Sequence, residues 1–195
     1  YRAAGGGTIV DAQPVLGGRM AELLERASVE SGVKIIASTG FHKTIFYYED
    51  SYLFYKNEDE IARLYIEEIE EGMFSSKQTG AQRLACRAGQ IKTAIDKNGI
   101  HADETYEKLF AAAADAALAT GVPAMVHIEQ EADAHKMGRK VILHSGIQPV
   151  KENAGNSTFI ETYKQFTVFR GKRQVCGSRI DILCYNIINN PIQLI

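Results

Sequence analysis

The sequence lacks several features that would assign it quickly to a class of protein. Its 195 residues include no tryptophan and only three cysteines, none of them in a CxxC pair. An odd number of widely spaced cysteines argues against a disulfide scaffold and against a zinc knuckle. This cysteine usage fits a reducing compartment, so we expect a cytoplasmic protein.

Long apolar runs and strong net charge are missing as well. No stretch reaches the roughly 20 apolar residues of a membrane-spanning helix, so we expect no membrane partner. The formal net charge is only −2 at pH 7, which gives no reason to expect binding to nucleic acid. The chain starts at Tyr1 without a charged segment, an apolar run and a cleavage site, so no signal peptide is expected.

The sequence does contain short apolar strands separated by amphipathic helices. A strand, a helix and a second strand in this order normally form a parallel, right-handed unit. We therefore predict an α/β protein with a parallel sheet. The expected strands are residues 8–11, 33–38, 90–95 and 124–128, and the expected helices are residues 18–31, 57–72 and 104–120.

The second of these helices has a recognisable start and an acidic end. Asn57 followed by Glu60 predicts a capping box at its first turn. Near its end lies an acidic run, which we interpret as the solvated face of the helix: Glu67, Glu68, Glu70 and Glu71.

One lysine, Lys92, interrupts the apolar strand at residues 90–95. A lysine in a strand can extend its stem past apolar neighbours and leave its ammonium in water. However, alternation places Lys92 on one face of its strand, and Met125 and His127 on one face of the next. Lys92 and His127 are therefore expected to point into the same space near the carboxyl ends of neighbouring strands, where barrel enzymes place their chemistry.

Four segments resemble consecutive pieces of the phosphotriesterase family (phosphotriesterase-related proteins), which belongs to the amidohydrolase superfamily. They are GGGTIVDAQP, IIASTGFHK, RAGQIKTAI and GVPAMVHIEQEAD, and the resemblance covers residues 1–151. It implies a partial TIM (β/α)8 barrel of about four βα units, corresponding to strands two to five of the family barrel. Residues 152–195 would then be a divergent tail of uncertain structure.

The resemblance also implies a chemistry. In the family, the lysine of strand four is carboxylated and bridges two divalent metals such as zinc, and the histidine of strand five binds one of them. The matching positions are Lys92 and His127, which become the expected metal ligands and catalytic residues. The implied reaction is hydrolysis of a small-molecule lactone, carboxylic ester or phosphate ester by a metal-bound hydroxide.

Other residues carry weaker functional signals. Asp11 ends the first strand, where an aspartate is more often a loop or cap residue. His42 does not fit the family's ligand pattern, although it could touch a substrate. The aromatic loop at residues 46–55 either packs its own rings or walls a pocket for an apolar leaving group or acyl chain. His135 and His144 are interpreted as surface residues.

The resemblance ends near residue 151. The family pattern continues with a strand ending in a histidine and later an aspartate, whereas this chain has no histidine beyond His144 and only Asp181. The paired histidines of the family's first strand are unmatched, and a closed barrel usually needs about 250 residues. We therefore expect a fragment with an incomplete site that self-associates through exposed sheet edges.

Three functions remain open on the sequence alone. The first is a binuclear metal hydrolase of the phosphotriesterase type. The second is a catalytically inactive relative that keeps the fold and binds a small ligand or nothing. The third is a nucleic-acid or protein adaptor acting through the basic turn at residues 170–173, between strand-like runs at residues 158–169 and 179–188.

Overall fold

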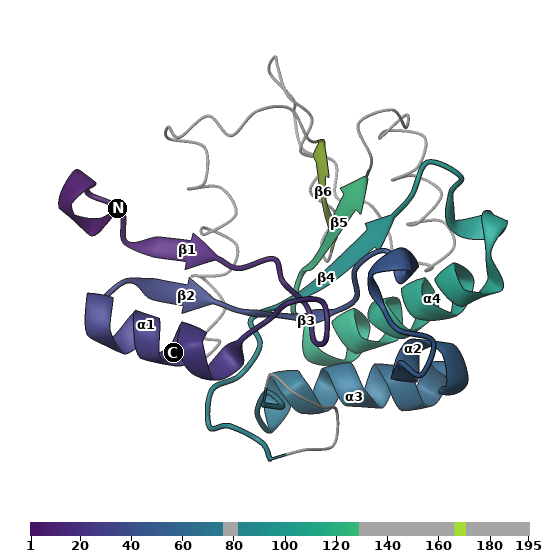
Figure 1. The fold of residues 1–195 in the computed structure, drawn as a ribbon, viewed down its shortest axis with the longest axis horizontal. Helices are drawn as coiled ribbons and strands as arrows, with labels where there is room; N and C mark the ends of the chain where they lie inside the picture. Colours follow the sequence, from purple (N-terminus) through teal and green to yellow (C-terminus); the bar gives the residue numbers. More distant parts are fainter. Residues whose placement is uncertain (76–81, 129–165, 171–195) are drawn as a thin grey trace.

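The fold consists of parallel sheets with helices packed against them (Figure 1). The computed structural model describes residues 1–75, 82–128 and 166–170. The strands are β1 (Thr8–Val10), β2 (Lys34–Ile36), β3 (Ser38–Gly40), β4 (Gln90–Ile95), β5 (Ala124–Ile128) and β6 (Phe166–Arg170). The α-helices are α1 (Ala21–Ser31), α2 (Tyr52–Tyr55), α3 (Glu58–Glu70) and α4 (Glu104–Thr120), and short 3₁₀ turns occur at Arg2–Ala4, Thr44–Phe46 and Ile100–Ala102.

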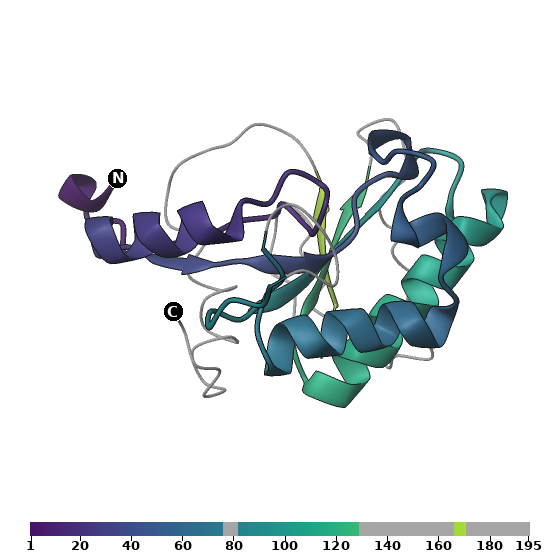
Figure 2. The same ribbon diagram turned by 60° about the horizontal axis from the view of Figure 1, so that its bottom comes forward.

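Every paired strand runs parallel to its neighbour. β1 pairs with β2, and a second sheet has the order β3-β4-β5-β6. Figure 2 shows α3 and α4 side by side on one face of this second sheet. The expected α/β class with a parallel sheet is confirmed, and β4 and β5 have the bounds that the sequence predicted.

The strand expected at residues 33–38 is instead two strands, β2 and β3, that meet at Ala37. The backbone N–H of Asp11 donates to the carbonyl of Ile36 over 2.8 Å, whereas the N–H of Gly89 donates to the carbonyl of Ala37 over 2.9 Å. One extended segment therefore pairs with β1 through its first half and with β4 through its second. This exchange of partners joins the two sheets.

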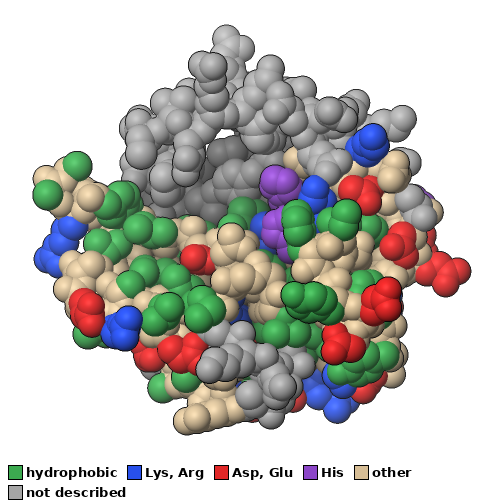
Figure 3. Space-filling view, viewed as in Figure 1, with side chains coloured by type: hydrophobic (Ala, Val, Ile, Leu, Met, Phe, Trp, Pro, Cys, Tyr) green, Lys and Arg blue, Asp and Glu red, His purple; other side chains and the backbone are tan. Residues whose placement is uncertain are grey.

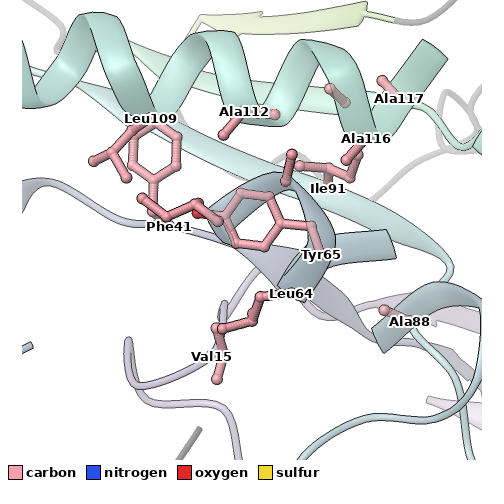
Figure 4. Packing of buried hydrophobic residues seen from close by; sticks show 14 of the residues in the cluster. Val15, Phe41, Leu64, Tyr65, Ala88, Ile91, Leu109, Ala112, Ala116 and Ala117 are labelled. Atoms are coloured by element: carbon pink, nitrogen blue, oxygen red, sulfur yellow. The ribbon is translucent and has the colours of Figure 1, made fainter. Parts of the chain in front are cut away.

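The main core lies between the second sheet and the helices α3 and α4. The alanine-rich helix α4 packs against the sheet, and Ala112, Ala116 and Ala117 are fully buried beside Ile91 of β4 (Figure 4). Alanine side chains let the helix approach the strands closely. No described helix is long and apolar enough to cross a membrane.

Helix α1 begins at Ala21, later than expected, because the residues before it take other conformations. Gly18 has a φ of +103°, outside the helical region. Arg19 turns inward and is 2% exposed. The helix ends at Ser31, where Gly32 provides a left-handed cap with φ 64°.

The interpretation of the acidic run as a solvated face is wrong for Glu68. Its side chain is fully buried and forms a two-pronged ion pair with Arg19, with N–O distances of 2.8 and 2.5 Å. Arg19 also donates to the carbonyls of Ser38 and Phe74. Glu68 lies on the buried side of α3 because it follows Ile61 by seven residues. Glu70 and Glu71 are exposed, as expected.

The segment expected to be a divergent tail contributes β6. This strand pairs in parallel with β5, in a register that sets Ala124 beside Phe166 and His127 beside Phe169. Arg170 is therefore the last residue of a strand rather than the first residue of a turn. Residues 158–165, the first part of the strand-like run at 158–169, lie outside the described residues. The run at 179–188 lies outside them as well.

Glu68→Gln is expected to lower the free energy of unfolding by on the order of 3–5 kcal/mol, because it leaves the buried Arg19 charge without a counterion. Urea unfolding followed by circular dichroism measures this. Glu70→Gln, on the exposed side of the same helix, should change the value by less than about 0.5 kcal/mol. Equal effects of the two substitutions would contradict a structural role for the ion pair.

Candidate functional site

Lys92 and His127 lie on the same face of the second sheet. The register pairs Lys92 with Met125 and Ala94 with His127, and side chains directly paired across parallel strands share a face. His127 is therefore two positions further along its strand than the partner of Lys92. The structure gives the two side chains the common face that alternation predicted.

The side chain of Lys92 is buried, with 3% of the residue exposed. Its Nζ donates to the carbonyl oxygen of Thr93 over 2.8 Å. Burial disfavours the ammonium form and lowers the pKa of Lys92 to about 7. A large fraction of this amine is therefore neutral at physiological pH, and a neutral amine is a nucleophile.

Gly40 brings the end of β3 into close contact with the backbone of Lys92. Its φ is +100°, and a Cβ at this position would lie 2.0 Å from the carbonyl oxygen of Lys92. The same oxygen accepts a hydrogen bond of 2.7 Å from the N–H of Phe41. The turn thus requires glycine both for its conformation and for space. In the sequence, the residue that indicates this turn is Gly40 itself, the last residue of β3.

The turn at Gly40 sends the next two side chains in different directions. Phe41 is fully buried and packs edge-on against Phe110 of α4, with ring centroids 5.2 Å apart. His42 lies beside His127, with ring centroids 6.0 Å apart. The structure therefore adds His42 to Lys92 and His127, a grouping that sequence reasoning did not predict.

The ring of His42 is held by its own loop. Its Nδ1 accepts a hydrogen bond of 2.8 Å from the backbone N–H of Lys43. The ring also packs edge to face against the ring of Phe46, with ring centroids 4.7 Å apart. The backbone N–H of His42 donates to the hydroxyl of Tyr47 over 2.9 Å. Burial, followed by the positive charges of Lys92, His127 and Lys43, lowers the pKa of His42 to about 4. The ring is therefore neutral at physiological pH.

The aromatic loop contains both buried and exposed side chains. Tyr52 is buried, and its hydroxyl donates to the carbonyl of Gly40 over 3.4 Å. By contrast, Phe46 and Tyr48 are 59% and 87% exposed, and Ile45, just before the loop, is 82% exposed. Figure 3 shows histidine side chains near the centre of one face of the molecule, with hydrophobic side chains next to them.

The other candidate residues do not join this group within the described residues. Asp11 follows β1, and its Oδ1 accepts a hydrogen bond of 2.8 Å from the N–H of Gln13, which is the local turn role that an aspartate commonly takes. His135, His144 and Asp181 lie outside the described residues. Across residues 1–75, 82–128 and 166–170, no group of three or more His, Cys, Asp or Glu side chains could hold a metal ion.

Comparison with known proteins agrees with the four segments noted in the sequence. The model of the phosphotriesterase family matches residues 1–150. An aryldialkylphosphatase from Saccharolobus solfataricus is 32% identical over 146 residues, which cover 74% of this chain and 42% of that protein. A phospho-furanose lactonase from Mycoplasmopsis synoviae is 33% identical over 146 residues, covering 71% and 40%.

A solved structure shows the same relationship. The crystal structure of an amidohydrolase from Mycoplasma synoviae matches this chain with a TM-score of 0.61 and 33% sequence identity. The match covers 70% of this chain and 40% of that one. The chain matches about two fifths of the length of these relatives.

Lys92→Met is expected to remove a pH dependence of stability. Without metal and carbon dioxide, the unfolded chain binds the lysine proton up to about pH 10.5, whereas the folded chain releases it near pH 7. The free energy of unfolding of the parent chain should therefore rise across this interval, relative to the variant, by on the order of 3–5 kcal/mol. Urea unfolding at several pH values measures the difference. The exposed Lys97→Met is the control, and parallel curves for parent and Lys92→Met would contradict the burial of a titrating amine.

Gly40→Ala is expected to destabilise the chain by more than about 3 kcal/mol, because it combines backbone strain with a clash against the carbonyl of Lys92. Gly121→Ala is a matched control, since Gly121 has a φ of +72° but no atom within 4 Å of the added Cβ. Its cost should be about 1 kcal/mol. Thermal unfolding of both variants tests the comparison, and a smaller loss for Gly40→Ala would show that the close contact is absent.

Proposed function

Because the chain belongs to the phosphotriesterase family over residues 1–150, we propose that it forms part of a metal-dependent hydrolase of lactones, carboxylic esters or phosphate esters. The observation that carries the proposal is the buried Lys92 on the same sheet face as His127. Similarity to an aryldialkylphosphatase and a phospho-furanose lactonase supports a hydrolase of ester or lactone type. The parallel strands would be a portion of a (β/α)8 barrel. β1 would take the place of family strand two, the segment formed by β2 and β3 that of strand three, and β4 and β5 those of strands four and five.

Lys92 has the properties that carboxylation requires. Its neutral amine can attack carbon dioxide, forming an N–C bond and releasing one proton, and the product is a carbamate whose single negative charge is shared by two oxygen atoms. Burial favours this step because it suppresses the competing ammonium form. Lys92 would then become a bridging ligand for two divalent metals.

His127 would provide a neutral imidazole nitrogen, which is an ordinary zinc ligand. When bound, zinc or another divalent metal lowers the pKa of a water molecule and polarises the carbonyl or phosphoryl oxygen under attack. A metal site of this kind uses at least three protein ligands. Lys92 and His127 would therefore be joined by ligands from outside the described residues.

The loop after β3 would contact the organic part of the substrate. Phe46 packs against His42, and Ile45, Phe46 and Tyr48 expose apolar surface. Burying such surface against an acyl chain or an aryl leaving group is favourable. This extends the pocket role that the sequence left open for the aromatic loop.

A second candidate is a catalytically inactive relative that retains the fold and small-ligand binding. It is favoured by the shortage of ligands, since the described residues contain no group of three His, Cys, Asp or Glu side chains suited to a metal. Metal content distinguishes this candidate from a hydrolase.

Lys92→Ala and His127→Ala should each lower two quantities on the order of 100-fold or more. These are the amount of zinc retained after dialysis and the rate of hydrolysis of an aryl ester or a γ-lactone. Addition of ¹³C-labelled bicarbonate with zinc should give a carbamate signal that Lys92→Ala removes. Lys97→Ala and His101→Ala, both at exposed positions, are the matched controls. A chain that retains no zinc and shows no Lys92-dependent turnover would instead be the inactive relative.

A further inference from the structure

Tyr106 belongs to helix α4, yet it contacts the loop that follows β3. It lies in the first turn of α4 and is 2% exposed. Its hydroxyl accepts a hydrogen bond of 3.2 Å from the backbone N–H of Thr44, and the Thr44 hydroxyl lies 3.5 Å from the same oxygen. Its ring also lies near that of Phe41, with ring centroids 6.5 Å apart. Tyr106 therefore lies against the loop on both sides of His42 and Lys43.

The Tyr106 hydroxyl supplies an acceptor that the loop cannot supply by itself. Thr44 begins the 3₁₀ turn Thr44–Phe46, and the first N–H group of a helical turn has no acceptor within the turn. The hydrogen bonds of the turn itself start at Phe46, whose N–H donates to the carbonyl of Lys43 over 3.0 Å. Burial raises the pKa of Tyr106, so the hydroxyl stays protonated at physiological pH and can both accept and donate. Tyr106 thus caps the turn from a neighbouring helix.

Apolar packing contributes little to the position of this turn. The side chains of Ile45 and Phe46 are exposed, so their burial cannot hold the turn in one place. Hydrogen bonds therefore matter more here than in the core. The bond from Thr44 to Tyr106 connects the turn to α4, the helix that follows the strand of Lys92.

Helix α4 also contacts the far end of the same segment. The Nζ of Lys108 donates to the backbone carbonyl of Lys56, just after α2, over 2.8 Å. This contact resembles that of Tyr106, because both are hydrogen bonds between an α4 side chain and the backbone of this segment. It does not involve the turn that carries Phe46, so Lys108 provides a matched control for Tyr106.

We propose that Tyr106 is a positioning residue whose hydroxyl fixes the turn at Thr44–Phe46 and so sets how tightly the site binds the aryl or acyl part of an ester. The inference rests on the proposed hydrolase function. Tyr106 acts through Thr44 and does not itself touch the substrate. The proposed reacting groups, Lys92 and His127, are held by β4 and β5. Loss of the Tyr106 hydroxyl should therefore weaken binding and leave the chemical step nearly unchanged.

Amide hydrogen exchange followed by NMR tests the contact without turnover. Tyr106→Phe keeps the ring beside Phe41 and removes one oxygen atom. Exchange of the Thr44 N–H should then become on the order of 10-fold faster, whereas Lys108→Met should change it by less than about 2-fold. Equal exchange rates of Thr44 in the parent chain and in Tyr106→Phe would overturn the proposal.

Kinetics separate positioning from a general effect on stability. Where hydrolysis depends on Lys92, Tyr106→Phe should raise KM for phenyl acetate roughly 3- to 10-fold, the effect of one hydrogen bond, and change kcat by less than about 2-fold. γ-Butyrolactone, which has no aryl group, should show a smaller rise in KM, and Lys108→Met should leave both constants unchanged. A loss of folded protein would instead lower the apparent kcat at constant KM, and that result would overturn the positioning role.

Failure of the proposed function gives a different result. Hydrolysis that does not depend on Lys92 would overturn the hydrolase, and binding of phenyl acetate, followed by the amide signal of Phe46, then decides the role of Tyr106. An affinity roughly 3- to 10-fold weaker in Tyr106→Phe than in Lys108→Met would retain Tyr106 as a positioning residue of a ligand-binding site. Equal affinities of these two variants would overturn that role as well.

Discussion

The close contact between Gly40 and the backbone of Lys92 is the constraint on which the site depends. Without a side chain at Gly40, the end of β3 can turn directly over β4, and the carbonyl of Lys92 accepts the N–H of Phe41. Phe41 then fills the core beside α4, and His42 emerges next to His127. The backbone conformation at Gly40 therefore affects both how Phe41 packs in the core and where His42 lies in the site.

Parts of the fold follow from local sequence, and other parts depend on distant partners. The strands β4 and β5 could be predicted because each is a short apolar run between turn-forming residues. The burial of Glu68 was missed, although its spacing from Ile61 indicated the inner face. A buried carboxylate is favourable only with a counterion, and Arg19 lies 49 residues away in the sequence.

The candidate site shows the same division. Alternation along two strands was sufficient to place Lys92 and His127 on one face. His42 could not be placed in this way, because it follows a turn whose direction depends on contact with another strand. No pattern of spacing within residues 38–47 specifies that the ring will lie beside His127 or that its Nδ1 will accept the N–H of Lys43.

The electrostatics of the site explain why an anionic group there would be stabilising. The charged forms of Lys92, His127 and Lys43 are all positive, and each of them lowers the pKa of His42. Burial adds a further penalty on the ammonium of Lys92. A carbamate on Lys92 would introduce a negative charge among groups whose charged forms all lower the pKa of His42. Burial therefore favours the proposed chemistry only in that it increases the fraction of neutral Lys92 amine that can attack carbon dioxide.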